Sequence, residues 1–478
     1  MELLELSGVA LASLIRRGEV SSREVVAAHI AQIEAVNPVL NAVVADRFEA
    51  ALVEADEADA RRGGDVGPLN GVPCTIKECF ALTGMPNASG LVARAGVRAA
   101  SDATAVARLR AAGAIPMGVT NTSELCMWME TNNRLYGRTN NPYDPRRIVG
   151  GSSGGEGAII GAGASPLGIG SDVGGSIRMP AFFNGVFGHK PTGGLIPNTG
   201  QYPAIETAAG SRYLTTGPLC RRAEDLMPLV RILAGPDGAD PGCQVLPLSD
   251  PSAVDLSGVR VLTVPDDGLL SVCSELRQAQ ADAAEALAAR GARIEEVRFP
   301  RLKSATDIWS AMLGEASTVP FRDSLYRGEE RTRTALLRWM LGGGAYTLPA
   351  ILLAGLERIT DAFPARAERF IAEGRALRTA LDAALGPDSL LLYPSHPTPA
   401  PRHYVPLTRP ISWVYTAIFN VMELPATQVP LGLDAKGMPL GVQVVGAHGA
   451  DHRTIAAALA LEAELGGWVP PWHTKTSR

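Results

Sequence analysis

The sequence predicts an α/β protein: an α/β/α sandwich in which helices flank one large, twisted, mixed β-sheet. Short apolar runs alternate along the chain with longer runs of helical periodicity. Such alternation is typical of helices that cover a mostly parallel or mixed sheet. The chain has 478 residues, of which 46% are hydrophobic and 19% charged, and this composition suits a protein with a sizeable core.

The N-terminal part supplies the first of these elements. Residues 22–38 carry apolar side chains at helical spacing, between a serine start and a proline stop. Residues 71–80 indicate a short strand entered through Gly-Val-Pro, and residues 102–121 indicate a helix, a glycine stop and a buried strand. The first twenty residues lack the basic start and cleavage pattern of a signal peptide, so we expect a helix of the mature protein there.

The same pattern returns later in the chain. Residues 255–299 predict a strand at 259–264, a helix at 274–291 and a strand at 292–299. Residues 437–465 repeat the strand and the helix. Because no internal repeat, charge block or linker interrupts the pattern, we expect one domain over residues 1–478.

Composition excludes several classes of function. A formal net charge of −5 provides no basic field for nucleic acid. The six cysteines have no CxxC pairing, which favours reduced thiols in a cytoplasmic protein over disulfides or a zinc site. His448 and His452 are four residues apart, but an isolated pair is a weak metal signal. We therefore expect chemistry without a metal or a cofactor.

Glycines are densest in residues 150–194, and three interpretations compete for them. A phosphate-binding loop requires GxxxxGK[ST] and a dinucleotide fold requires GxGxxG, and neither pattern is present. A second interpretation is an oxyanion hole, in which the N–H groups of Val173, Gly174, Gly175 and Ser176 face one carbonyl oxygen. A purely structural glycine-rich turn is an equally open alternative.

Longer motifs resemble those of the amidase signature family. The segments "GGSSGGEGA" and "GSDVGGSIRMPAFFNGVFGHKPT" are similar to its signature, and "GVPCTIK" resembles the strand that carries its lysine. The resemblance covers most of the chain, is strongest over about residues 70–225, and leaves a variable substrate or cap region over about residues 300–410. Residues 121–158 and 178–191 are similar to fatty-acid amide hydrolases, particularly the vertebrate second type. Those enzymes carry an N-terminal transmembrane segment, which we do not find in this chain.

The resemblance implies a catalytic triad and its support. Lys77 corresponds to the base, Ser152 to a bridging serine that follows a cis peptide bond, and Ser176 to the nucleophile. Burial disfavours the charged form of a lysine, which is consistent with a base at Lys77. The resemblance also places three residues in a supporting shell around the triad. They are Ser153, Asp172 and Arg178.

The sequence indicates the substrate specificity less clearly than the catalytic residues. Five apolar residues could line an acyl pocket, although ordinary core packing explains each of them as well. They are Met127, Trp128, Met129, Met179 and Phe182. Residues 339–356 contain no charge, but three glycines and Pro349 make them a poor membrane span. They could form a flap over the substrate, a shallow membrane contact or a buried helix pair.

The sequence thus predicts a serine hydrolase that cleaves C–N bonds of hydrophobic amides or carbamates, with esters as further substrates. Its partner is a small apolar substrate, not nucleic acid, and it is a monomer or a homodimer. The alternative is the amidase subunit of a tRNA-dependent amidotransferase. That subunit usually has a glutamine where Met179 stands. A non-catalytic binding protein is disfavoured because all three triad positions are intact.

Overall fold

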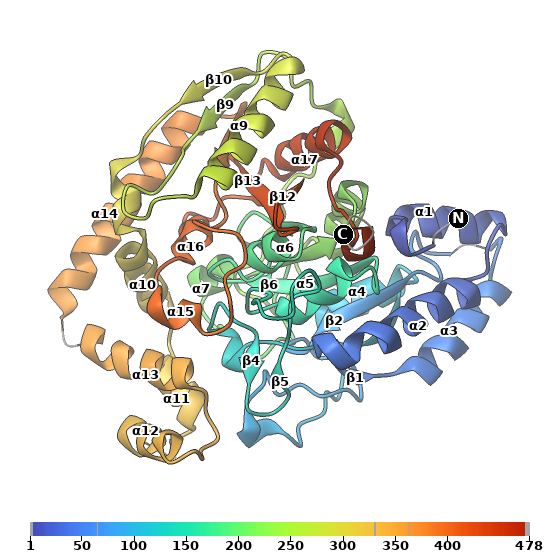
Figure 1. Cartoon of the computed structure of the whole chain (residues 1–478), viewed down its shortest axis with the longest axis horizontal. Helices are drawn as coiled ribbons and strands as arrows, with labels where there is room; N and C mark the ends of the chain where they lie inside the picture. Colours follow the sequence, from blue (N-terminus) through green and yellow to red (C-terminus); the bar gives the residue numbers. More distant parts are fainter. Residues whose placement is uncertain (1–2, 65, 329–330, 362, 474–478) are drawn as a thin grey trace.

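The computed structural model describes residues 3–64, 66–328, 331–361 and 363–473. One mixed sheet of eleven strands forms the centre of this described part, with helices against both faces (Figure 1). The predicted fold class is therefore confirmed. The strands, in their spatial order, are β1 (Val43–Asp46), β3 (Ile115–Thr120), β2 (Pro73–Lys77), β6 (Leu167–Asp172), β8 (Thr215–Cys220), β7 (Phe187–Lys190), β12 (Ala426–Leu433), β13 (Pro439–Gly446), β11 (Ser389–Tyr393), β9 (Arg260–Thr263) and β10 (Arg293–Glu296).

Strand direction divides the sheet into three parts. At one end β3, β2 and β6 are parallel, and at the other end β11, β9 and β10 are parallel. The strands between them run antiparallel to their neighbours, as does β1 at the edge. A separate ribbon pairs β4 (Asn132–Asn133) with β5 (Gly137–Arg138). The parallel trio matters most for function, because parallel strands bring their carboxyl ends to one edge.

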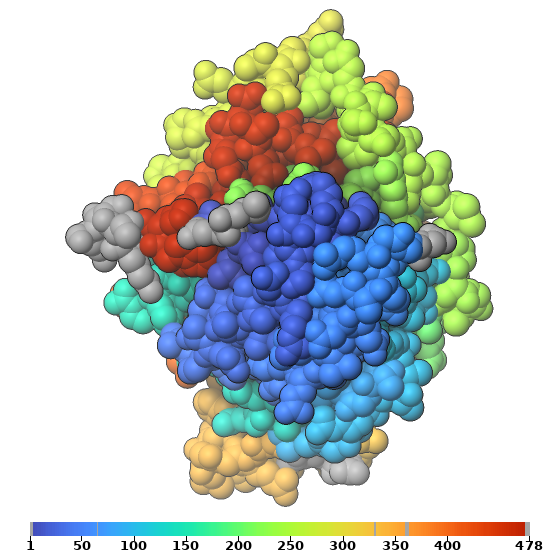
Figure 2. Space-filling model, turned by 90° about the vertical axis from the view of Figure 1, so that its right-hand side faces the viewer, coloured from blue at the N-terminus to red at the C-terminus, as the bar shows by residue number. Residues whose placement is uncertain are grey.

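Helices cover the sheet in two layers. Side chains of five helices share a core cluster on one face: α1 (Gly8–Arg17), α4 (Thr104–Ala111), α8 (Leu226–Leu233), α9 (Ser274–Ala289) and α17 (Asp451–Leu465). The principal helices of the other two clusters that pack on the sheet are α2 (Ser22–Leu40), α3 (Phe48–Ala60), α5 (Gly154–Gly161), α6 (Arg178–Phe183), α10 (Ala305–Ala316), α14 (Pro364–Leu385) and α16 (Val414–Val421). Two short helices, α7 (Ala208–Tyr213) and α15 (Val405–Thr408), lie in the connections. Figure 2 shows the N-terminal helices on one side of the molecule, next to the C-terminal segment.

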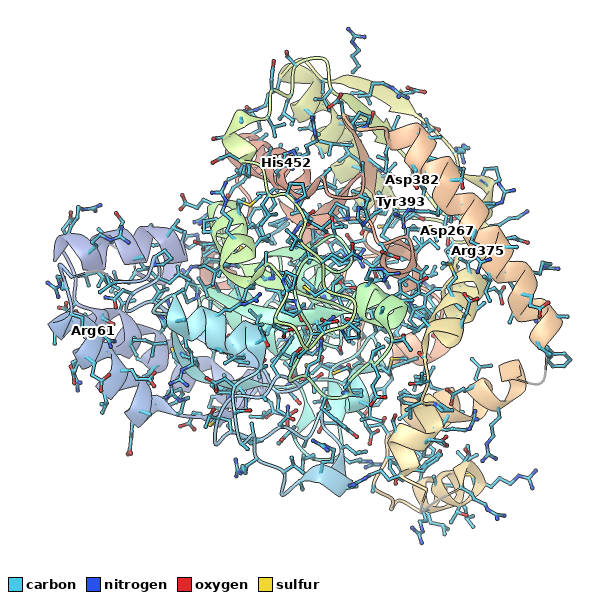
Figure 3. The ribbon with its side chains drawn as sticks, turned by 180° about the vertical axis from the view of Figure 1, so that it is seen from behind. Arg61, Asp267, Arg375, Asp382, Tyr393 and His452 are labelled. Atoms are coloured by element: carbon cyan, nitrogen blue, oxygen red, sulfur yellow. The ribbon has the colours of Figure 1, made fainter. Side chains whose placement is uncertain are left out.

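The β11 strand shows how one sheet serves two cores. Leu390 and Leu392 pack into the cluster that includes α9 and α17, whereas Leu391 and Tyr393 pack into the cluster that includes α10 and α14. Successive side chains of a strand point to opposite faces, so a strand buried on both faces is apolar at every position. Figure 3 labels Tyr393 beside α14, the helix that carries Arg375 and Asp382.

Three helices form a cap that stands away from the sheet at the lower left of Figure 1. They are α11 (Phe321–Tyr326), α12 (Thr332–Met340) and α13 (Leu348–Asp361). Their core is a separate cluster that includes Leu325, Tyr346 and Ile351, together with Leu125 from the main body. Residues 339–356 thus contain the end of α12, a loop and most of α13. Within the described segments, no helix has the length and apolar character needed to cross the bilayer.

The predicted elements are present, with differences at their ends. The helix predicted over residues 22–38 begins at Ser22 behind an N-cap at Ser21, but it continues through Pro38 to Leu40. It ends at Asn41 in a left-handed conformation, so the proline stop was wrong. The strand predicted over 292–299 is only Arg293–Glu296, because its one neighbour, β9, is four residues long and pairs with all of it.

Candidate active site

The three predicted triad residues come from one edge of the parallel trio. Lys77 is the last residue of β2, and β2 lies beside β6 in parallel. Ser176 lies in the turn between β6 and α6, and Ser152 lies just before α5. Because β2 and β6 end at the same edge, the lysine and both serines meet there.

Lys77 is fully buried and is held by two hydroxyl groups. Its Nζ lies 2.7 Å from Ser152 Oγ and 2.9 Å from Ser171 Oγ, and the lysine side chain has no exposed surface. Ser171 was missed by the sequence analysis, although it lies next to Asp172 in the same motif. The lysine is therefore not a surface ion-pair residue, and its closest described partners are neutral.

The loop that presents Ser152 depends on close backbone contacts. The peptide bond between Gly151 and Ser152 is cis, as the family resemblance implied. A Cβ atom on Gly151 would overlap the carbonyl oxygen of Trp128, so only glycine fits there. Thr131 Oγ1 donates to the Gly150 carbonyl at 2.9 Å and accepts from Gly154 N–H at 3.1 Å. These contacts hold the loop against the segment before it.

Ser176 is the most accessible of the three, with 7% of its surface exposed against 1% for Ser152. Both serines line the same cavity. Within the described part of the chain no hydrogen bond joins their two Oγ atoms, and catalytic hydrogen bonds often tighten only when substrate binds. Ser153, predicted as support, donates from its N–H to the Ser176 carbonyl at 3.2 Å and from its Oγ to the Ser171 carbonyl at 3.3 Å.

The turn over residues 173–176 corrects one part of the predicted oxyanion hole. The N–H of Gly175 donates to Asp172 Oδ1 at 2.7 Å, so it is already committed. Gly175 has φ of +109°, and a Cβ atom there would overlap Thr416 Oγ1. The turn therefore requires glycine for its shape, and Gly175 supplies no free donor. The N–H groups of Val173, Gly174 and Ser176 remain the candidates.

Asp172 and Arg178, also predicted as support, form a fully buried ion pair. Two guanidinium nitrogens of Arg178 lie 3.0 and 3.1 Å from the two carboxylate oxygens of Asp172. Burial opposes ionisation of Asp172, but the Arg178 charge and backbone N–H donors hold its pKa well below the ordinary value. Arg178 also donates to Asn420 Oδ1 at 2.7 Å and to Gln443 Oε1 at 2.9 Å. The sequence analysis missed both of these C-terminal partners.

Two other buried carboxyl groups lie close to Lys77 in sequence or space. Glu78 turns away from Lys77 and accepts from the N–H groups of Ala88 and Ser89. Burial raises its pKa to about 7. Glu156 accepts from the hydroxyls of Thr75 and Thr120, and burial raises its pKa to about 8 although the Lys77 charge opposes the shift. Neither carboxylate makes a salt bridge with Lys77 among the described residues.

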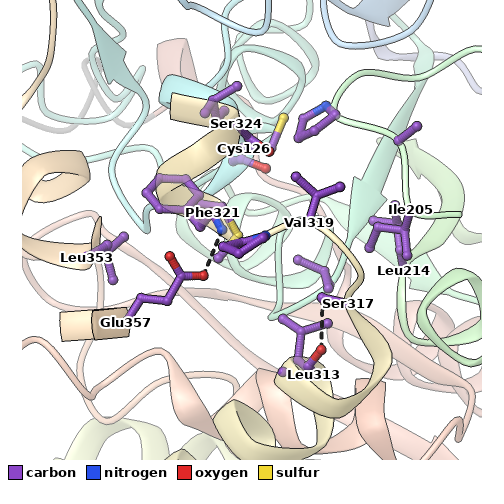
Figure 4. Close-up of a pocket in the computed structure, with 18 of the residues that line it drawn as sticks. Cys126, Ile205, Leu214, Leu313, Ser317, Val319, Phe321, Ser324, Leu353 and Glu357 are labelled. Atoms are coloured by element: carbon purple, nitrogen blue, oxygen red, sulfur yellow. Dashed lines mark hydrogen bonds between the residues drawn. The ribbon is translucent and has the colours of Figure 1, made fainter. Parts of the chain in front are cut away.

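The site opens into a mainly apolar cavity of about 440 Å³, shown in Figure 4. Ser152, Ser171 and Ser176 lie in its wall, and the remainder comes largely from α10, α11, α13 and the loop before α7. The apolar residues labelled in Figure 4 are Ile205, Leu214, Leu313, Val319, Phe321 and Leu353. The Glu357 carboxylate accepts from the Phe321 N–H at 2.7 Å, which ties α13 to the start of α11. The cap is thus a wall of the cavity.

The predicted acyl-pocket residues divide between cavity and core. Met127 lines the cavity. Met129, Met179 and Phe182 instead belong to the core cluster around α10 and α16, and the most exposed of these three has 4% of its surface accessible. Trp128 packs half-buried against that cluster and is not part of the cavity wall. The prediction was wrong for these four residues because apolar character does not tell which surface a side chain covers.

Polar groups elsewhere in the described chain do not combine into a metal site. Over residues 3–473, outside the gaps given above, no three potential ligands among His, Cys, Asp and Glu come together. His448 precedes α17 and His452 lies in its first turn. All six cysteines are free thiols, and Cys74, Cys79 and Cys220 are buried.

The sequence matches a protein-family model and several known relatives. The family model described as Amidase matches residues 24–455. The chain belongs to the amidase family. It is 48% identical to fatty-acid amide hydrolase 2-B of Danio rerio, with 98% of this chain and 91% of the relative covered. The identity falls to 31% for a glutamyl-tRNA(Gln) amidotransferase subunit of Lachnospira eligens, over 98% of this chain and 99% of the relative.

The amidase fold is also found among solved structures. The structure of 6-aminohexanoate cyclic dimer hydrolase superposes with a TM-score of 0.81 at 28% identity, covering 97% of each chain. The predicted resemblance to the amidase signature family, and within it to fatty-acid amide hydrolases, is therefore confirmed. The chain is an amidase-family hydrolase of C–N bonds.

Proposed function

We propose that this amidase cleaves hydrophobic amides through an acyl-enzyme on Ser176, with Lys77 as the base and Ser152 between them. The observation that carries the proposal is the 2.7 Å contact between Lys77 Nζ and Ser152 Oγ, at the base of an apolar cavity that Ser176 also lines. A serine hydroxyl needs a base to become a good nucleophile, and Lys77 is the base that reaches this site.

In the first step the Ser176 Oγ attacks the substrate carbonyl carbon. Ser152 takes the proton of Ser176 and passes its own proton to neutral Lys77. The carbonyl oxygen becomes an oxyanion, which the N–H groups of Val173, Gly174 and Ser176 are available to bind. Removal of one such donor typically costs about 10²–10³ in rate.

In the second step the proton held by Lys77 is delivered to the leaving group. The Lys77 ammonium, again through Ser152, protonates the amine nitrogen as the C–N bond breaks, so the nitrogen departs as a neutral amine. Water then adds to the acyl-Ser176 ester and releases the acid. Ser171, the second partner of Lys77, keeps the ammonium hydrogen-bonded while it carries the proton.

The cavity supports an apolar substrate. Its wall is formed mainly by aliphatic and aromatic side chains from α10, α11 and α13. The proposed substrates are fatty amides, anilides and aryl or alkyl carbamates. Carbamates belong to this set because they present the same carbonyl group and amine leaving group as an amide. Esters are expected side substrates, because they use the same nucleophile and oxyanion site.

The amidotransferase alternative receives less support. Relatives of that kind match at 31–32% identity, against 48% for the zebrafish hydrolase. Met179 also stands where that subunit usually has a glutamine. Activity on a small amide with neither tRNA nor a partner chain would argue for the hydrolase.

The test of the proposal is covalent labelling. A fluorophosphonate should modify Ser176 alone, and peptide mass spectrometry should find the adduct there. Ser176→Ala should remove labelling and turnover, while its melting temperature stays close to wild type because the side chain is small. An adduct on Ser152 or Ser153, or turnover by Ser176→Ala, would contradict the assignment.

A further inference from the structure

Trp309 reaches the active-site turn from a distant part of the chain. It lies on α10, in the region that resembles the family least, and its indole Nε1–H donates to the Val173 carbonyl at 2.7 Å. The side chain is 8% exposed and lines the cavity. The contact therefore joins the substrate wall to the turn that precedes Ser176.

The contact to the Val173 carbonyl also affects the Gly174 N–H, because both groups belong to one peptide unit. A trans peptide is planar, with its C=O and N–H pointing in opposite directions. The Val173 carbonyl and the Gly174 N–H belong to one such unit, and this bond is not among the cis bonds of the chain. A donor that holds the carbonyl of Val173 therefore also fixes the direction of the Gly174 N–H.

The next peptide unit is held in the same manner. Thr416 Oγ1 lies 3.0 Å from the Gly174 carbonyl and 2.9 Å from the Trp413 carbonyl, so these two acceptors share its one proton. The N–H of Gly175, in the same unit as the Gly174 carbonyl, donates to Asp172 Oδ1. Two successive peptide planes are thus held by side chains of α10 and α16. The N–H of Gly175 is committed to Asp172, whereas the unit held by Trp309 contains the Gly174 N–H, one of the three remaining candidate donors.

The indole ring itself is held in place. Trp413 packs against Trp309 edge to face, with ring centroids 4.6 Å apart and planes at 75°. Trp413 directs its own Nε1–H to the Pro410 carbonyl at 2.7 Å, away from the turn. Trp309 therefore donates to the active-site turn, and Trp413 supports its ring.

We propose that Trp309 is a positioning residue, whose indole N–H aims the Gly174 N–H at the oxyanion of the tetrahedral intermediate. The inference deepens the proposed function and rests on it, since it assumes acyl transfer at Ser176. Trp309, a residue of the variable region, would then contribute to binding of the transition state. This role is separate from its contact with the substrate as part of the cavity wall.

The test compares Trp309→Phe with Trp468→Phe, a control that also removes a buried indole donor, here to the Gly161 carbonyl at the end of α5 far from Ser152. For Trp309→Phe we expect kcat on a neutral anilide to fall about 10- to 100-fold, less than loss of an oxyanion donor itself, with KM changed less than about threefold. A trifluoromethyl ketone with the same acyl chain forms a tetrahedral adduct with the nucleophile. The affinity of Trp309→Phe for this ketone should fall by a similar factor. The corresponding alcohol, which cannot form an adduct, should bind almost unchanged. Trp468→Phe should leave the ratio of ketone to alcohol affinity at the wild-type value.

Other results would overturn the inference. If kcat is unchanged in Trp309→Phe, or if the affinities for the ketone and the alcohol fall equally, Trp309 acts only as part of the cavity wall. If Trp309→Phe does not fold, 3-benzothienylalanine at position 309 removes the N–H and keeps the bicyclic ring, and the same ratio decides. Failure of the proposed function appears separately, as turnover by Ser176→Ala or labelling of another serine.

Discussion

Lys77 Nζ and Ser152 Oγ lie 2.7 Å apart, although 75 residues separate them in the sequence. The contact exists because β2 ends at Lys77 beside β6, while the cis bond before Ser152 belongs to a loop packed at the same edge. Neither partner is more than 1% exposed. The two side chains are therefore in contact and almost completely buried.

Replacement of Lys77 by alanine should harm amides more than activated esters. Both reactions need Ser176 to lose its proton, but only the amine leaving group strictly needs a proton on departure. General acid–base help is typically worth about 10²–10⁴, so the ratio of amide to ester kcat/KM should fall by a measurable part of that range. The measurement is kcat/KM for an anilide and a p-nitrophenyl ester of one acyl chain. A variant with the wild-type ratio would show that Lys77 is not the base.

The cap predicts a contrast between two neighbouring leucines. Leu353 lines the cavity, whereas Leu352 points outward with 51% of its surface exposed. Leu353→Asp should lower kcat/KM for a long-chain anilide roughly 10- to 100-fold, in line with the value of a buried leucine contact, and spare the acetyl anilide. Leu352→Asp should change both less than about twofold. Equal losses on both substrates in Leu353→Asp, with a lower melting temperature, would indicate a purely structural role.

The buried carboxyl group of Glu124 should make the stability of the folded protein depend on pH. Its carboxyl group is buried and accepts from the N–H and hydroxyl of Thr347, both at 2.8 Å, which ties the cavity wall to the start of α13. Burial raises its pKa to about 7 although the Thr347 donors oppose the shift. Between pH 4.5 and about 7 the folded state therefore keeps a proton that the unfolded state has lost. The contribution of this group to stability is fully present below about pH 4.5 and is lost as pH rises through 7.

Glu124→Gln should remove that dependence, because glutamine does not titrate. The melting temperature of the variant, relative to wild type, should rise as the pH is raised from about 5 to about 8. Glu34→Gln, on an exposed position of α2, serves as the control, and its difference from wild type should stay constant. Differential scanning fluorimetry across this pH range is sufficient. A constant difference for Glu124→Gln as well would mean that Glu124 does not bind a proton in this range.

The sequence by itself determined the fold class and the residues that lie within continuous motifs. Hydrophobic periodicity showed where strands and helices alternate, since it follows directly from which face of each element is buried. The motif over residues 150–178 contains Ser152, Asp172, Ser176 and Arg178 together, so the resemblance of this one stretch to the family was enough to nominate them. Lys77 followed from the resemblance of its strand to the family.

The tertiary structure decided what depends on packing between distant segments. Trp309 on α10 and Thr416 on α16 reach the active-site turn, and no local pattern marks them. The same is true of Asn420 on α16 and Gln443 on β13, which reach Arg178. The acyl wall could not be inferred either, because an apolar side chain such as Phe182 satisfies a core and a cavity equally well until its neighbours are known. The donor at Gly175 was misassigned for a similar reason, since the partner of a backbone N–H is set by the three-dimensional path of the turn.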